Sequence, residues 1–546
     1  MRFKIEYSLL IILLLHISLV FFSMSQMVHG DEIAFPECAK GVIERGKPVF
    51  DVGILKPNLP CLQHPPTYVY LVALSIMIFG ENVYSFRLVS AIFNLLTIIL
   101  VYFTTKEIFT KNKNKEKIAL IASFLYALNP LAIQSSIVID IDGGLLLFFI
   151  IFLIYFFVKK RNSYWIILPL FLVFWSKETG SVLLFASFFI FYAVQKDWKN
   201  LFKIITIFFI SGILFLVSFW IYTAYLNLDF TMPFKHNFNL KNTASRSLYL
   251  TFVRSAWAFK TFFYFTAPFF IMLFLITSTK FYYNIWKKRK IDNDEKNLLF
   301  LNIFSFVTII LFTYLGANGW GFPKYYIAAL PAMSIFIAGF LLKGYDFKIK
   351  TEDLVRFVLL LITMIFYFVL FFGDPLIPEF DATAQNADFR IAAILILKSF
   401  ILYVIIPFFI ALFFSRKNAI ISLIFLIIIF YSYINILHAG VNYSTYYNYG
   451  DNGLEKVIEF FKDNNIEPNQ ILSYPNLGYY IGMSDYNEIM FVYNNPDLFR
   501  ENVIENNEII YMVIYERDIG RIGMENMKYF KLERKFGTYY IFKKII

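Results

Sequence analysis

The run YSFRLVSAIFNLLTIILVYFTTK, residues 84–106, decides the class of fold to which this chain belongs. Its 23 residues are mostly apolar and exceed the roughly 20 residues that an α-helix needs to cross a bilayer. Comparable runs recur, and we predict about 13 membrane spans in an α-helical polytopic membrane protein. The expected spans are 8–27, 84–106, 118–138, 143–158, 163–176, 180–195, 202–226, 256–279, 298–316, 325–342, 354–373, 395–414 and 418–437.

Composition excludes a soluble globule. Of 546 residues, 59% are hydrophobic and 16% are charged, whereas ordinary soluble domains carry about 25% charged residues. The net charge of +11 comes largely from basic residues in alternate loops, so it indicates topology and not a nucleic-acid surface. Under the positive-inside rule, these loops and the N-terminus are cytoplasmic. The first run lacks a clear cleavage site, so we expect it to be a retained span of a cell-membrane protein.

Three segments outside the membrane are expected on the extracytoplasmic side: residues 28–83, the polar segment 227–255, and residues 438–546. Residues 28–83, within the transmembrane domain 1–437, form a long first loop whose apolar part, 68–79, suits an interfacial helix. Residues 438–546 have ordinary soluble composition and mix helix-like and strand-like runs, which predicts a small α/β domain. Cys38 and Cys61 both lie in the first loop, where either a disulfide or two free thiols would fit.

Carboxylates gather on the turns that are predicted to face outward. Asp31 and Glu32 follow the first span, and Asp140 and Asp142 flank one residue between the third and fourth spans. A charged carboxylate at a membrane face raises the free energy of the protein unless it is solvated or paired, so such residues commonly have a function. They could therefore simply end helices, hold a divalent cation or act in catalysis.

Basic residues lie close to the same turns. Lys177-Glu178 joins the fifth and sixth spans, Arg87 enters the second span, and Lys324-Tyr325 enters the tenth; His64 precedes the interfacial helix. These cations could reach lipid headgroups or hold a phosphate. A carboxylate can accept a proton from an attacking hydroxyl while a cation stabilises a departing phosphate. The set indicates group transfer from a lipid phosphate to an external acceptor.

The order of these motifs resembles a known family. Asp31-Glu32, the run AKGVIERGK at 39–47, His64-Pro65-Pro66 and Phe86-Arg87-Leu88 are similar to the first loop of the protein O-mannosyltransferase and aminoarabinose transferase superfamily. These are membrane glycosyltransferases of the GT-C fold (family 39-like). The resemblance implies inverting transfer of a single hexosyl or pentosyl unit from a polyprenyl- or dolichyl-phosphate donor. The acceptor would be a protein, a glycolipid or a glycan.

The resemblance also implies roles for individual residues. Asp31 would be the catalytic base with Glu32 beside it, and Asp140 or Asp142 would be the second external aspartate. The residues expected to bind substrate are His64, Arg87, Lys177, Glu178, Lys324 and Tyr325. A divalent cation on Asp140, Asp142, His64 and Glu32 is one expectation, although members without metal are expected too.

Departures from the family leave the substrate open. The aminoarabinose branch has an arginine where this chain has Ala34, and a lysine where it has His64. The Trp-Trp-Asp-Tyr-Gly signature of oligosaccharyltransferases does not occur, so transfer of a whole oligosaccharide is not expected. Two other classes stay open: a transporter or flippase for a lipid-linked sugar, and a non-catalytic membrane scaffold. A transporter would need charges at mid-membrane depth, and a scaffold would not need Asp31, Asp142 or Lys177.

Overall fold

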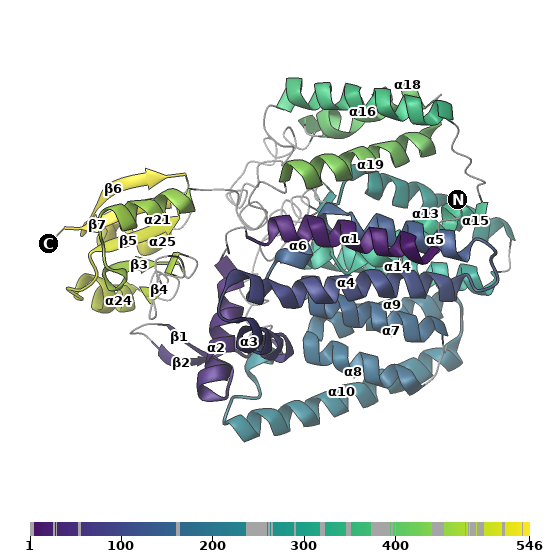
Figure 1. The fold of residues 1–546 in the computed structure, drawn as a ribbon. Coiled ribbons are helices and arrows are strands. Elements are labelled where there is room, and N and C mark those ends of the chain that lie inside the picture. Colours follow the sequence, from purple (N-terminus) through teal and green to yellow (C-terminus); the bar gives the residue numbers. More distant parts are fainter. Residues whose placement is uncertain are drawn as a thin grey trace.

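A helical bundle with a small sheet domain at one end makes up the structure (Figure 1), which is a computed structural model. The residues it describes are 5–25, 28, 30–52, 56–159, 164–235, 259, 262–263, 266–288, 291–316, 323–344, 351–372, 394, 397–398, 400–415, 418–438, 453–474, 477–478, 480, 487–488, 496–515, 519–537 and 539–545.

Long apolar helices form the bundle because they bury one another's faces in a continuous core of aliphatic and aromatic side chains. The helices are α1 (Ile5–Ser23), α4 (Val83–Ile108), α5 (Lys115–Ala127), α6 (Pro130–Ile137), α7 (Leu147–Lys159), α8 (Ile167–Ser176), α9 (Glu178–Val194), α10 (Trp198–Leu226), α13 (Pro268–Lys288), α14 (Asn293–Gly316), α15 (Ala329–Gly344), α16 (Thr351–Phe372), α18 (Ile406–Phe414) and α19 (Ala419–His438). Short 3₁₀ or π turns adjoin them: η1 (Gly30–Ile33), η2 (Asp142–Leu146), η3 (Tyr164–Ile166), η4 (Pro323–Tyr326) and η6 (Ile401–Ile405).

The predicted multi-pass fold is confirmed, but the count of 13 spans is not. Within the described residues, four helices are individually long and apolar enough to cross a membrane. Two bent helix pairs raise this number to six if each pair forms one span. Several other predicted spans are apolar helices of only 10–17 residues. The chain is therefore a multi-pass membrane protein.

Two predicted spans differ in detail. The span predicted at 118–138 is two helices, α5 and α6, bent by 62° at Asn129-Pro130. Proline cannot donate a backbone hydrogen bond, and the Asn129 side chain caps the new helix by accepting from Leu131 N. Of the span predicted at 256–279, the stretch before residue 266 lies mostly outside the described residues, and the remainder belongs to α13, which begins at Pro268 and continues to Lys288. The hydropathy of the sequence falls after residue 279, so the predicted span ended before the helix does. The last turns of α13 combine buried Phe281 with exposed polar and aromatic side chains.

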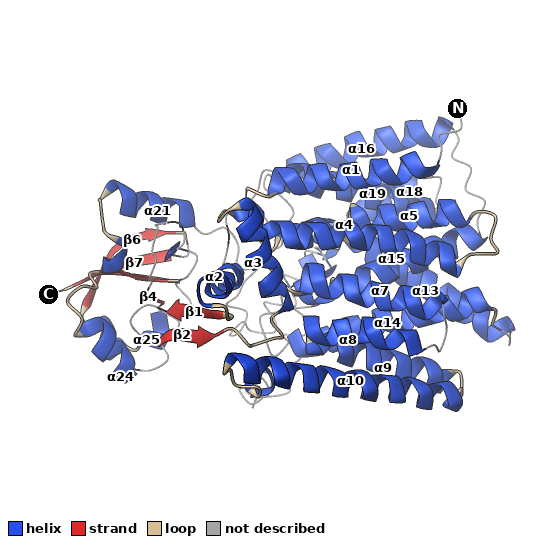
Figure 2. Cartoon of the chain, turned by 60° about the horizontal axis from the view of Figure 1, so that its bottom comes forward, coloured by secondary structure: helices blue, strands red, loops and turns tan. Residues whose placement is uncertain are grey.

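The first loop lies at the end of the bundle that faces the sheet domain (Figure 2). It contains α2 (Ala34–Arg45), the antiparallel strands β1 (Val49–Val52) and β2 (Lys56–Pro60), and α3 (Thr67–Phe79). Helix α3 matches the predicted interfacial helix, and its last turn exposes Met77, Ile78 and Phe79. A disulfide joins Cys38 of α2 to Cys61, directly after β2. The loop is therefore covalently closed.

The C-terminal part is the expected small α/β domain. Its sheet has the order β4-β3-β5-β7-β6, with β3 parallel to β4 and β5, and β7 antiparallel to β5 and β6. Its elements are α21 (Leu454–Asp463), η7 (Pro468–Gln470), β3 (Ile471–Ser473), β4 (Asn487–Glu488), α24 (Pro496–Phe499), η8 (Arg500–Ile504), β5 (Tyr511–Tyr515), α25 (Ile519–Ile522), α26 (Met524–Met527), β6 (Phe530–Phe536) and β7 (Tyr539–Lys544). The backbone N–H of Val28 donates to the Tyr480 hydroxyl, which links this domain to the start of the first loop.

Two glycines allow the turn η2 to approach its neighbours closely. A Cβ atom at Gly143 would lie 2.7 Å from Ser135 Cβ and 3.0 Å from Ser135 O, on α6. A Cβ atom at Gly144 would lie 2.9 Å from Ser90 Cα, on α4. Both contacts involve backbone that cannot rotate away, so larger residues would push η2 from its place.

Replacement of Gly143 by alanine should therefore destabilise the protein. We expect Gly143→Ala to lower the free energy of unfolding by about 2 kcal/mol, a typical cost of overpacking a core, seen as a lower melting temperature in detergent. Gly212→Ala on α10 is the matched control, because its Cβ would meet only Phe174 Cζ at an ordinary 3.8 Å. Equal melting temperatures for both variants would contradict this reading of η2.

Candidate active site

Residues 139–143, which we call the Asp140 turn, connect α6 to α7 at the end of the bundle that faces the sheet domain. Both carboxylates of this turn are buried, with Asp140 6% and Asp142 5% exposed. Within the turn, the Asp142 backbone N–H donates to Asp140 Oδ1 at 3.0 Å. Each carboxylate also meets a lysine from a different part of the chain. The turn therefore gathers the charged residues that the sequence singled out.

Asp142 pairs with Lys177, which stands between α8 and α9. Lys177 Nζ donates to Asp142 Oδ1 at 2.8 Å and to Oδ2 at 2.7 Å. Burial alone would lower the pKa of Lys177, but Asp142, Tyr325 and Asp140 together outweigh burial and raise that pKa above its usual value. Lys177 is therefore a cation even though its side chain is only 9% exposed.

Asp140 pairs with Lys324 of η4 in the same way. Lys324 Nζ donates to Asp140 Oδ2 at 2.5 Å. Burial would raise the pKa of Asp140, yet the ammonium groups of Lys324 and Lys177 outweigh it and hold that pKa below its ordinary range. The two lysines also share the Tyr325 ring, with their Nζ atoms 5.5 Å and 5.6 Å from its centroid. Two cations and two carboxylates therefore form one buried site.

Glu32 fastens the first loop to this site. Its Oε1 accepts a hydrogen bond of 2.9 Å from the backbone N–H of Ile139, in the Asp140 turn. Arg87 Nη2 lies 3.8 Å from the same oxygen, and Arg87 Nη1 donates to Met24 O at 2.8 Å. Arg87 is completely buried. The arginine and the glutamate together hold η1 against the bundle.

Asp31 precedes Glu32 in η1, so its backbone adjoins the fastening point. Its side chain lies outside the described part of the structure. The proposed role of Asp31 as base stays a prediction that rests on this backbone position and on the family resemblance.

His64 and Glu178 form a further pair at the edge of the site. His64 Nδ1 lies 3.0 Å from Glu178 Oε1, and both side chains are about one-fifth exposed. Glu178 follows Lys177 directly, so this pair adjoins the Asp142–Lys177 pair. Every predicted site residue whose side chain is described thus lies in one connected cluster of paired charges.

The sequence analysis missed the polar groups that hold the Asp140 turn from behind. The Asn94 amide of α4 donates to Gly143 O at 2.8 Å, and its carbonyl oxygen accepts from Tyr126 and Ser135 at 2.6 Å and 3.2 Å. All four residues are buried. The available signal was an asparagine in the middle of a mostly apolar span, since polar residues in spans commonly join helices.

A divalent cation stays an untested prediction. Among the described side chains, no group of three His, Cys, Asp or Glu residues is placed to hold a metal ion. The four expected ligands are instead engaged elsewhere: Asp140 and Asp142 with lysines, Glu32 with Ile139 N, and His64 with Glu178.

Comparison with known proteins agrees with this fold. Residues 63–224 match the family described as dolichyl-phosphate-mannose-protein mannosyltransferase. No curated protein sequence matches the chain significantly.

Three solved structures are similar. ArnT from Cupriavidus metallidurans bound to undecaprenyl phosphate has 12% identity and a TM-score of 0.58, and covers 98% of each chain. Its apo form has 13% identity and a TM-score of 0.56, covering 98% of this chain and 97% of ArnT. The Archaeoglobus fulgidus oligosaccharyltransferase, at 14% identity, has a TM-score of only 0.47 over 94% of this chain and 70% of its own.

The similarity to ArnT extends over bundle and tail alike, which confirms the predicted GT-C fold with a small C-terminal α/β domain. Together with the family match over residues 63–224, it shows that the chain is similar to GT-C membrane glycosyltransferases and shares their fold. The resemblance that the first-loop motifs indicated is thereby confirmed.

Removal of one partner from a buried pair should be costly. We expect Lys177→Met to lower the free energy of unfolding by about 3 kcal/mol, because it leaves the Asp142 charge buried and uncompensated. The double variant Lys177→Met/Asp142→Leu should recover most of the loss, as measured by melting temperature in detergent. Lys235→Met is the control, since the Lys235–Asp229 pair is exposed and such pairs contribute little. A single variant as stable as the wild type would contradict the assigned pairing.

Proposed function

We propose that the protein transfers a single sugar from a polyprenyl- or dolichyl-phosphate donor to an acceptor hydroxyl on the extracytoplasmic face, with inversion. The observation that carries the proposal is the pair of buried lysines at the Asp140 turn. They lie at the end of the bundle that faces the C-terminal domain (Figure 1), in the fold of a protein whose structure holds undecaprenyl phosphate. Lysine ammonium groups of this kind suit the phosphate of such a donor.

In the proposed reaction, the acceptor oxygen attacks the anomeric carbon of the sugar. The bond from that carbon to the phosphate oxygen breaks, and its electron pair leaves with the lipid monophosphate. The acceptor's proton passes to the Asp31 carboxylate, which acts as general base. A single displacement of this kind inverts the anomeric configuration. Lys177 and Lys324 stabilise the negative charge that develops on the leaving phosphate.

The other residues position these groups. Arg87 is wholly buried and bound to Glu32 and Met24 O, so we assign it to holding η1 and Asp31 in place. Asp140 and Asp142 keep the two lysines oriented toward the shared Tyr325 ring. The exposed fraction of His64 and Glu178 suits contact with the sugar or the acceptor.

The donor sugar, hexosyl or pentosyl, and the kind of acceptor follow from neither the fold nor the charges. Ala34 and His64 depart from the aminoarabinose branch, and the family match is to mannosyltransferases. A mass-spectrometric comparison of surface glycans with and without the protein would identify the product directly.

The base can be tested by Asp31→Asn. We expect transfer from polyprenyl-phosphate mannose or polyprenyl-phosphate aminoarabinose to membrane acceptors to fall at least about 100-fold, the usual range for loss of a general base. Product is measured by mass spectrometry at equal protein level and melting temperature. Glu44→Gln, which neutralises an exposed carboxylate of the same loop, is the control and should retain full activity. Undiminished transfer by Asp31→Asn would refute the mechanism, and donor movement without any covalent product would favour a flippase.

Metal dependence can be tested by chelation. Because lysines already neutralise Asp140 and Asp142, we expect the transfer rate after dialysis against EDTA to stay within about twofold of the untreated rate, a difference too small to reflect loss of a group that stabilises the transition state. Loss of activity that Mg²⁺ or Mn²⁺ restores would show that a cation takes part.

A further inference from the structure

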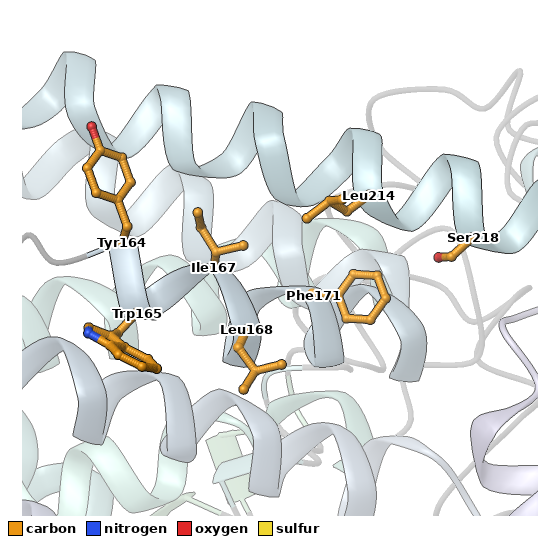
Figure 3. A pocket seen from close by; sticks show the side chains of 7 residues that line it. All are labelled: Tyr164, Trp165, Ile167, Leu168, Phe171, Leu214 and Ser218. Atoms are coloured by element: carbon orange, nitrogen blue, oxygen red, sulfur yellow. The ribbon is translucent and has the colours of Figure 1, made fainter.

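A concave apolar groove lies on the outer face of the bundle between α8 and α10 (Figure 3). Its volume is about 650 Å³, within the range of small-molecule sites. Trp165, Leu168 and Phe171 form one side, and Leu214 and Ser218 of α10 form the other. Helix α10 is peripheral, since only 33% of its most apolar stretch is buried, against 56–67% for the other three long candidate spans. The groove therefore faces lipid.

The groove begins at the end of the bundle opposite to the active site. Helix α8 ends at Ser176, beside the site residue Lys177, so Tyr164 and Trp165 before its first turn mark the far end. Helix α10 rises about 22 Å between Lys203, which lies beside Tyr164, and Ser218. This length exceeds half of the roughly 30 Å thickness of the hydrocarbon core. The groove is thus long enough to receive one lipid chain from the far leaflet.

Basic residues surround that far end. Lys203 Nζ lies 4.9 Å from the centroid of the Tyr164 ring, at the mouth of the groove. Lys196 and Lys199 are exposed on the turn before α10 and on its first turn. Asp197 lies between these lysines in the sequence, and its carboxylate caps α10 by accepting hydrogen bonds from Asn200 N and Asn200 Nδ2. The mouth therefore carries net positive charge next to exposed aromatic rings, as at a membrane interface.

We propose that this groove binds one acyl chain of an anionic phospholipid, with Lys199 and Lys203 holding its phosphate. The lysine distribution predicts that this leaflet is cytoplasmic, where anionic lipids attract basic segments. The occupant is not the sugar donor, because a phosphate at Lys203 is at the opposite end of the bundle from Lys177 and Lys324. This lipid site is thus independent of the proposed sugar transfer.

The test uses the full chain purified in mild detergent and native mass spectrometry. The probes are dipalmitoyl phosphatidylglycerol and dipalmitoyl phosphatidylcholine, which share chains and differ in charge. We expect the anionic lipid to bind at about tenfold lower concentration. Lys199→Ser/Lys203→Ser should abolish that preference, because each lysine near an anionic lipid contributes an attraction of roughly this order. Leu214→Trp, which fills the groove, should weaken binding of both lipids about tenfold, as expected when a fitted pocket is lost.

Matched controls separate the site from general effects. Lys111→Ser/Lys113→Ser removes two exposed lysines from the loop between α4 and α5. Val217→Trp places the same side chain at an exposed position of α10 outside the groove. Both controls should bind lipid as the wild type does, and all variants should share its melting temperature. Equal binding of the two lipids would overturn the proposal, as would unchanged binding by Leu214→Trp. A dimer that Leu214→Trp dissociates would assign the groove to a second copy of the chain.

Discussion

The candidate site depends on two buried ion pairs, Asp142–Lys177 and Asp140–Lys324. Charges in an apolar environment are tolerated only when they are paired and hydrogen-bonded. Each carboxylate here needs its lysine, and each lysine needs its carboxylate. Because Lys177 and Lys324 come from segments far apart in sequence, this mutual need fixes where α8, α9 and η4 meet the Asp140 turn.

The same constraint links the membrane bundle to the parts outside it. Ile139 N, within the Asp140 turn, binds Glu32 of the first loop. That loop is closed by the Cys38–Cys61 disulfide and touches the C-terminal domain through Tyr480. A ligand that changed the pairing at the turn would therefore act on the loop that carries Asp31. Under the proposed function, the lysines would stabilise the buried carboxylates when no phosphate is bound, and the leaving phosphate when one is bound.

Much of the fold and of the charged cluster could be predicted from the sequence, because the length of apolar runs indicates helices and charged residues between them indicate the turns. The bundle, the interfacial helix α3, the α/β tail and the residues of the charged cluster were all predicted. Which lysine pairs with which aspartate was not predicted. Lys324 binds Asp140 and not Asp142, and the local sequence around these residues does not distinguish the two partners. The break at Asn129-Pro130 and the extension of α13 to Lys288 were also missed, because hydropathy averages over single proline and lysine residues. The support from Asn94 depends on the bend of α6, which brings Ser135 and Gly143 to it.

The most direct test of the central claim is the affinity of undecaprenyl phosphate, measured by calorimetry, for Lys324→Met/Asp140→Asn. This double variant removes the cation without leaving a buried charge, so its melting temperature should stay near that of the wild type. Loss of a charge-assisted hydrogen bond to phosphate predicts an affinity about 10- to 100-fold lower. An unchanged affinity in a stable protein would show that Lys324 serves only the fold, and would contradict the role assigned to the paired lysines.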